Sequence, residues 1–224
     1  MIGGVCDYRA RMSLPGTASP IALVITDALR SYTDHYTYSR KVNWVIDSLG
    51  HVGFTDIRDQ VILTEAYRPS RQPLRMVRNM QFRDLSVGLL QSASVVVMCG
   101  GNAIAILQSF QERAHTHATL LTALRQVIEK QCLLLSWSAG TTVSGISAEM
   151  TRDRKWRLPL DTGAPLDRRG LCLIPGYSFR PHTNSSDVAE LLQVMRNRIF
   201  LHMPNGTTYV TIPDEHYVVF NYGD

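Results

Sequence analysis

The chain has 224 residues, of which 45% are hydrophobic and 19% are charged, and its formal net charge is +4 at pH 7. This composition is typical of a globular protein with a sizeable core, and we expect residues 1–224 to form a single domain. The modest charge permits an acidic substrate without requiring nucleic acid, and no apolar run approaches the roughly 18 residues of a membrane span.

Apolar strands alternate with helices along most of the chain. Strands are predicted at 20–26, 59–64, 94–98 and 132–135. Helices are predicted at 32–49, 103–114 and 119–130, with a short helical piece at 85–90 and a loop containing a short helix at 66–82. Further strands are expected at 170–174, 177–180, 208–212 and 217–221, and an amphipathic helix at 187–198. The alternation predicts an α/β fold with a parallel sheet covered by helices on both faces.

The sequence SWSAG at 136–140 follows the strand expected at 132–135. A serine between a strand and a helix, flanked by small residues, is the layout of a nucleophile elbow, which would make Ser138 a nucleophile and Ala139 an oxyanion amide. The usual first glycine of that pattern is Ser136 here. The alternative is an ordinary buried strand followed by a serine that caps the helix.

A second glycine turn, GGN at 100–102, ends the strand expected at 94–98. It lacks the spacing of a dinucleotide-binding or P-loop motif. It is either a tight connection from strand to helix or the source of a second oxyanion amide, because glycine allows close approach of a substrate. Asn102 in this turn is a candidate substrate contact.

Two downstream segments carry groups that suit a serine hydrolase. His182 lies at the end of a predicted strand and is the candidate base, although a core or surface histidine is the simpler reading. Arg180, two residues earlier, would share its face of the strand and could bind a carboxylate, or could instead pair with a surface acid. The sequence PDEH at 213–216 places acids on a turn. The cationic segment 151–170 is either a solvated loop or a rim that attracts carboxylates.

Several short motifs together resemble the family of serine peptidases that contains dipeptidase E (alpha-aspartyl dipeptidase) and cyanophycinase. GGN with Ile106 and Leu107 resembles the family's G-G-N-x-x-x-L-L, and SWSAG resembles its G-W-S-A-G. GLCLIPG at 170–176 resembles the G-L-G-L-L-P-G before the catalytic histidine of cyanophycinases. RPHT at 180–183 stands where dipeptidase E has N-P-H-F, and IPDE at 212–215 resembles its L-P-E. The resemblance covers nearly the whole chain.

The resemblance implies a flavodoxin-like fold related to class I glutamine amidotransferases, with serine replacing their cysteine. It assigns Ser138 as nucleophile, His182 as base, and the amides of Gly101 and Ala139 as the oxyanion hole. The family acid falls on Asp214, or on Glu215 with a slip of one residue.

Asp153 matches another family acid, which orients the site or binds the substrate's amino group. We expect a small peptide or amide substrate, no cofactor or metal, no nucleic-acid or membrane partner, and a monomer or homodimer. Four scattered cysteines without a C-x-x-C pair, and no apolar signal-peptide core, favour a cytoplasmic location.

The chain departs from the family at Ser136 in place of glycine, Thr141 in place of alanine and Thr183 in place of phenylalanine. Two hypotheses therefore follow. The first is a serine peptidase that cleaves a peptide or isopeptide bond next to an aspartyl group through an acyl-enzyme. The second is an altered member, either an acyl transferase or cyclase or a non-catalytic peptide-binding protein.

Overall fold

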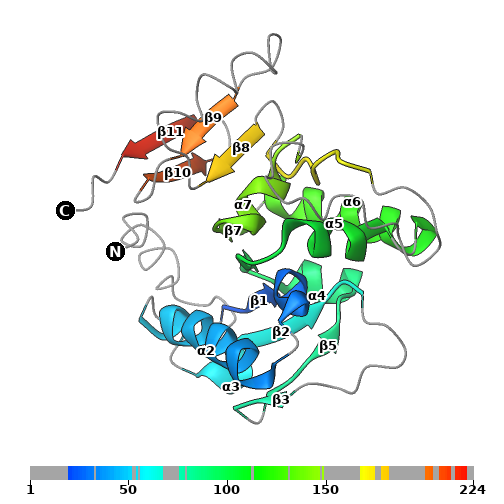
Figure 1. Ribbon diagram of the computed structural model, residues 1–224, viewed down its shortest axis with the longest axis vertical. Coiled ribbons are helices and arrows are strands. Elements are labelled where there is room, and N and C mark those ends of the chain that lie inside the picture. Colours follow the sequence, from blue (N-terminus) through cyan, green and yellow to red (C-terminus); the bar gives the residue numbers. More distant parts are fainter. Residues whose placement is uncertain are drawn as a thin grey trace.

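The computed structural model describes residues 20–32, 34–51, 54, 56–67, 76–78, 80–111, 114–130, 132–146, 148, 167–174, 178–181, 200–203, 207–212 and 215–220. Its centre is a five-stranded sheet in the order β5-β2-β1-β6-β7 (Figure 1). The strands are β1 (Ala22–Ile25), β2 (Val61–Glu65), β5 (Arg83–Asp84), β6 (Val95–Met98) and β7 (Leu133–Ser136). Every neighbouring pair in this sheet is parallel. The order around β1 is flavodoxin-like, as expected from the sequence.

Helices connect the strands of the sheet. They are η1 (Asp27–Ser31), α2 (His35–His51), α3 (Ile57–Gln60), α4 (Val87–Ser92), α5 (Ala103–Gln111), α6 (Ala114–Lys130) and α7 (Ala139–Ser144). The 3-10 helix η1 was not predicted. The next helix, α2, begins where the Asp34 carboxylate accepts hydrogen bonds from the N–H groups of Tyr36 and Thr37. Among the described residues, no helix is long and apolar enough to cross a membrane.

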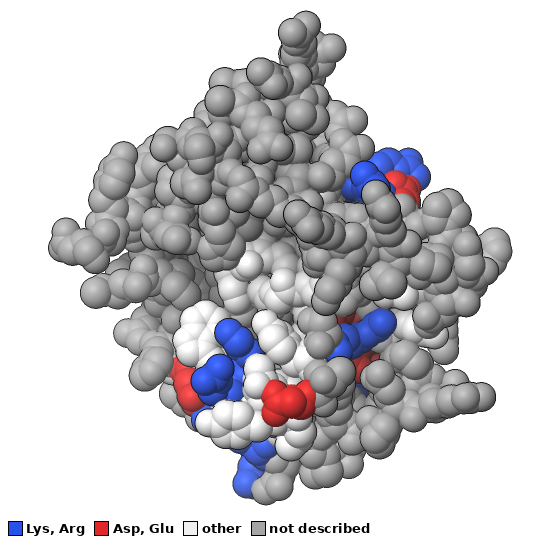
Figure 2. All heavy atoms as spheres, in the orientation of Figure 1, with Lys and Arg blue, Asp and Glu red and all other residues white. Residues whose placement is uncertain are grey.

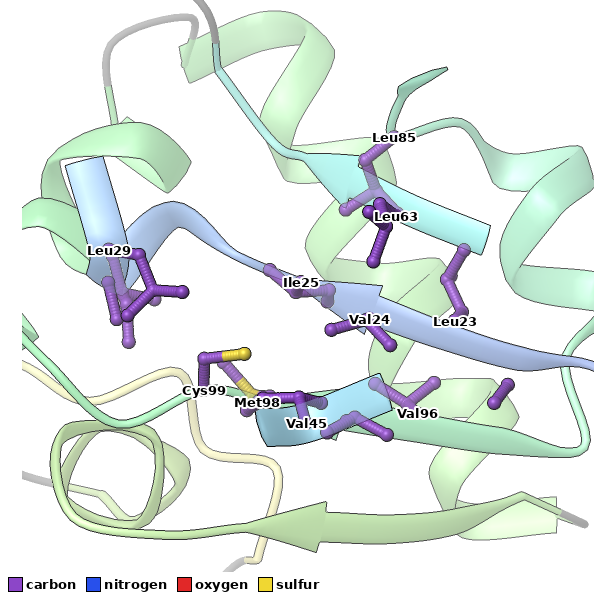
Figure 3. Packing of buried hydrophobic residues seen from close by; sticks show 14 of the residues in the cluster. Leu23, Val24, Ile25, Leu29, Val45, Leu63, Leu85, Val96, Met98 and Cys99 are labelled. Carbon is purple, nitrogen blue, oxygen red and sulfur yellow. The ribbon is translucent and has the colours of Figure 1, made fainter. Parts of the chain in front are cut away.

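The core lies on both faces of β1. The four residues of this strand are at most 1% exposed, because β2 and β6 flank it and other elements cover both of its faces. Figure 3 shows Leu23, Val24 and Ile25 beside Leu63 and Val96 of the neighbouring strands. A strand buried on both faces has no polar side, which explains its continuous apolar sequence. Residues of β7, at the edge of the sheet, are only half-buried.

Two predicted segments differ in the structure. Residues 66–82 were expected to form a loop with a short helix. Of this range, the described residues include β3 (Met76–Val77) and β4 (Met80–Gln81), a small antiparallel pair that buries Val77 and Met80 and was not predicted, while residues 68–75 lie outside the described residues. Residues 170–174 were expected to form a strand, and they do not. The N–H groups of Leu171 and Leu173 instead donate to the carbonyls of Val143 and Ser144, at 2.7 and 2.8 Å. This segment satisfies the end of α7, which would otherwise leave carbonyl groups without donors.

The C-terminal part adds two strand pairs. β8 (Ser178–Pro181) pairs in parallel with β9 (Phe200–Met203), and β10 (Thr207–Ile212) pairs antiparallel with β11 (Glu215–Phe220). The strands predicted at 177–180, 208–212 and 217–221 are therefore confirmed, while β9 was not predicted. β8 packs against α7, so this part of the chain is close to the predicted elbow (Figure 1). The helix predicted at 187–198 lies outside the described residues.

Candidate active site

Ser138 occupies a strained turn between β7 and α7. Its φ is 50° and its ψ is −118°, a combination that costs a residue with a side chain about 1–3 kcal/mol. Its hydroxyl makes no capping hydrogen bond to the N–H groups of α7. The geometry expected of a nucleophile elbow is confirmed, and the alternative of a helix-capping serine is wrong for this hydroxyl.

Hydrogen bonds to the main-chain oxygen of Ser138 hold this turn in place. The N–H group of Thr142 donates to it at 3.0 Å and the Thr142 hydroxyl at 3.2 Å. Ala139, the first residue of α7, is buried, and its N–H group lies in the first turn, where a helix offers no internal acceptor. This is the amide predicted to stabilise an oxyanion.

The glycine turn after β6 lies directly against the elbow. A Cβ atom built on Gly100 would lie 2.6 Å from Trp137 Cδ1 and 3.1 Å from Ser138 Cβ, so only glycine allows this approach. Gly101 has a φ of +147°, and a Cβ there would lie 2.5 Å from the main-chain oxygen of Ala28. The structure therefore brings the two turns together, because β6 and β7 are parallel neighbours that end at the same edge of the sheet.

Asn102 has a structural role that was not predicted. Its Oδ1 accepts hydrogen bonds from the N–H groups of Ile104 at 2.9 Å and Ala105 at 3.4 Å, so it caps α5. Its own N–H group donates to the main-chain oxygen of Ala28 at 2.9 Å. These bonds fix the glycine turn against η1, and a contact between Asn102 and substrate stays a prediction.

The first residue of η1, Asp27, carries a buried carboxylate. Asp27 is completely buried, and its oxygens accept hydrogen bonds from the N–H groups of Ala66 at 2.8 Å and Tyr67 at 3.3 Å. Burial raises the pKa of Asp27, while hydrogen bonds from Ser109 and Ala66 and the charge of Arg30 oppose the rise. Arg30 Nη1 also donates to Ser109 Oγ at 2.8 Å. The sequence reading missed this network, although an acid directly after a buried strand was a signal for it.

The described cysteines near the sheet do not supply a thiolate. Cys99 and Cys132 are buried and form no disulfide. Burial raises the pKa of the Cys99 thiol far above its ordinary value, and it raises the pKa of Cys132 to about 12. Both thiols therefore stay protonated near neutral pH, where a thiol is a poor nucleophile.

The remaining predicted site residues are less fully described. Asp153, His182 and Asp214 lie outside the described residues. Arg180 is in β8, opposite His202 of β9 in the strand register, and Glu215 is the first residue of β11. The position of His202 was not singled out from the sequence. Packing of β8 against α7 puts the Arg180 segment near the elbow.

Comparisons with known proteins agree with this architecture. A model of the family described as Peptidase family S51 matches residues 70–223. The crystal structure of a protein assigned as a peptidase E from Listeria monocytogenes EGD-e is similar at 14% identity and a TM-score of 0.51, covering 96% of this chain and 92% of that chain. A peptidase from an acI-B1 Actinobacterium is similar at 15% identity and a TM-score of 0.51, covering 92% and 76%. No curated protein matches the sequence significantly.

Proposed function

The chain belongs to peptidase family S51, and from this premise we propose that it is a serine hydrolase that cleaves a peptide or isopeptide bond beside an aspartyl group. The single observation that carries the proposal is the strained turn at Ser138, with an uncapped hydroxyl beside the Gly100–Gly101 turn. Strain of this kind persists where the surrounding structure enforces it, and such positions cluster at active sites.

In this proposal the reaction proceeds through an acyl-enzyme. The Ser138 oxygen attacks the substrate carbonyl carbon while His182 accepts the hydroxyl proton. The negative charge on the carbonyl oxygen is stabilised by the N–H groups of Gly101 and Ala139. The C–N bond then breaks, and His182 returns the proton to the leaving amine. Water then attacks the acyl carbon while His182 accepts a proton from it, and His182 returns a proton to the Ser138 oxygen as the acyl group leaves. Either Asp214 or Glu215 orients the imidazole.

Recognition of the acyl side is assigned to Arg180. A guanidinium grips a carboxylate with two hydrogen bonds, so Arg180 suits the side chain of an aspartyl residue. Asp153 is the candidate for holding the substrate's amino group or for orienting the site. Loss of a bidentate contact should cost roughly 2–5 kcal/mol of transition-state binding. A comparison of Asp-Leu with Asn-Leu on wild type and on Arg180→Met measures this contribution.

The proposal is tested by covalent labelling and turnover. A fluorophosphonate should label wild type and not Ser138→Ala, and Asp-X dipeptides and beta-aspartyl-arginine should be cleaved by wild type alone. Ser138→Ala should lower turnover by on the order of 10⁶, by the precedent of serine hydrolases. Equal labelling of the two proteins would rule out the nucleophile. Labelling without hydrolysis of any of these substrates would favour an acyl transferase or cyclase, and binding without labelling would favour a non-catalytic member.

A further inference from the structure

One face of α2 forms an open groove of about 370 Å³. It is lined by Tyr36, Ser39, Arg40, Asn43, Trp44 and Asp47. These positions recur at three- and four-residue intervals, which places them along one side of the helix. Figure 2 shows that the part of the surface where Figure 1 places α2 carries uncharged, basic and acidic side chains together.

The groove gathers aromatic surface that is exposed to water. Among the described residues, the large hydrophobic side chains that are exposed are Tyr36, at 73%, and Trp44, at 56%, and both line this groove. The guanidinium carbon of Arg40 lies 6.0 Å from the centre of the Tyr36 ring. Asp47 is paired with Arg78 at 2.7 Å. Tyr36 and Trp44 lie about two helical turns apart, so the groove carries exposed aromatic surface at both ends. Exposed apolar surface with a polar rim marks ligand-binding grooves.

Asn43 contributes a hydrogen-bond acceptor to the lining of the groove. Its Oδ1 atom is shielded from water and has no hydrogen-bond partner among the described residues. A shielded acceptor without a donor costs free energy, and rotation of the Asn43 side chain into the groove would let the N–H group of a ligand recover it. The groove therefore combines two aromatic rings, a cation and an acceptor that lacks a donor.

The groove reaches the candidate nucleophile through two tryptophans. The ring of Trp44 meets the ring of Trp137 edge to face, with centroids 5.3 Å apart and an interplanar angle of 76°. Trp137 precedes Ser138, and the position of a Cβ on Gly100 would lie 2.7 Å from Trp137 Nε1 and 3.1 Å from Ser138 Cβ. The Cδ1–Nε1 edge of Trp137 thus lies against Gly100, which also approaches Ser138, and the same ring contacts Trp44 of the groove.

We propose that the groove on α2 binds the leaving-group residue of the peptide substrate, and that Trp44 selects a large apolar or aromatic side chain there. The inference rests on the proposed function. β8, which carries Arg180 for the acyl side, and α2 lie on opposite sides of β7 and α7 (Figure 1). A substrate bound across Ser138 would therefore place its acyl side towards β8 and its leaving group towards α2. In this arrangement Arg40 binds the carboxylate that ends a dipeptide.

Selectivity for the leaving group tests the role of Trp44. Wild type should cleave Asp-Phe with a kcat/KM about tenfold or more above that for Asp-Ala, since apolar pockets discriminate by such factors. Trp44→Ala should bring the ratio close to one. Lys41→Ala is the matched control, because Lys41 is exposed on the same helix and does not line the groove. An unchanged ratio in Trp44→Ala would overturn the proposal.

A binding experiment separates this inference from the proposed function. Phenylalanine, the leaving group of Asp-Phe, should bind wild type, Ser138→Ala and Lys41→Ala in ligand-observed NMR, and should bind more weakly to Trp44→Ala. Alanine should bind none of them measurably. If phenylalanine binds in this pattern while no Asp-X peptide is cleaved, the groove stands and the proposed hydrolase fails. If peptides are cleaved but phenylalanine binds Trp44→Ala as it binds wild type, the groove assignment fails.

Discussion

Ser136 Oγ lies 3.2 Å from Thr141 Oγ1, so a hydrogen bond joins the last residue of β7 to α7 across the turn that contains Ser138. Ser136 replaces the first glycine of the G-W-S-A-G pattern that the chain resembles, and Thr141 replaces the alanine that follows that pattern in the family. In this chain the two departures contact each other. The pair links the two ends of the strained turn, in addition to the hydrogen bonds that Thr142 donates to the Ser138 main-chain oxygen, and we infer that it helps to hold the Ser138 backbone.

The coupling of this pair can be measured. Ser136→Ala and Thr141→Val should each lower the free energy of unfolding by about 1 kcal/mol, the usual contribution of one hydrogen bond. The double variant should lose less than the sum of the two, because either single change already removes the shared bond. Urea denaturation of the four proteins gives the coupling energy. Strictly additive losses would mean that the two hydroxyls act independently.

The backbone strain at Ser138 predicts that glycine is more stable than alanine at this position, although both substitutions remove the nucleophile. Glycine adopts positive φ without steric cost, whereas alanine does not. Ser138→Gly should therefore be more stable than Ser138→Ala by about 1 kcal/mol, while neither is labelled by a fluorophosphonate. Thermal and urea unfolding of the two variants make the comparison. A Ser138→Gly protein that is less stable than Ser138→Ala would mean that the turn is not strained.

The close approach of Gly100 to the elbow predicts opposite effects of two glycine-to-alanine changes. Gly100→Ala should destabilise the fold and slow fluorophosphonate labelling, because the new methyl group would displace Trp137 and Ser138. Gly88→Ala is the matched control, since a Cβ at this position in α4 meets nothing within 4 Å. That change should stabilise the helix by about 0.5–1 kcal/mol and leave labelling unchanged. Normal labelling of Gly100→Ala would show that the turn tolerates a side chain.

The buried Asp27 predicts a dependence of stability on pH. Burial raises its pKa above the ordinary value of 3.8, so the folded protein holds this proton more tightly than the unfolded chain does. The associated stability is fully present below pH 3.8 and is lost as the pH rises through the folded pKa. Relative to Asp27→Asn, the free energy of unfolding of wild type should therefore fall as the pH rises from 3.8 through the folded pKa of Asp27. Urea denaturation at a series of pH values measures this difference between the two proteins, and a difference that does not change with pH would refute the assignment.

The identity of the orienting acid can be decided by single substitutions. Glu215 is the first residue of β11, and Asp214, which precedes it, lies outside the described residues. Adjacent residues of an extended segment point to opposite sides, and only one of the two acids can then reach His182. We expect Asp214→Asn to lower turnover strongly and Glu215→Gln to have little effect. The reverse result would move the role to Glu215, and two active variants would move it to Asp153.

The parallel strands, the helices between them and the turn at Ser138 were predictable from the sequence. Each depends on neighbours in the chain: an apolar run such as 22–25 must be covered on both faces, and a serine between a strand and small residues predicts a sharp turn. The segment 170–174 shows the limit of such reasoning. Its apolar residues suit a strand, but its N–H groups are taken by the last carbonyls of α7, which no local pattern reveals.

Tertiary structure alone decided which distant residues surround Ser138. Gly100 reaches the elbow because β6 and β7 are neighbours in the sheet, and the tertiary position of α2 brings Trp44 against Trp137. The Asp27 carboxylate finds its donors at the end of β2 because β1 and β2 are paired in register. These contacts join residues far apart in the sequence, and their geometry depends on how the strands order themselves, which side-chain periodicity does not encode.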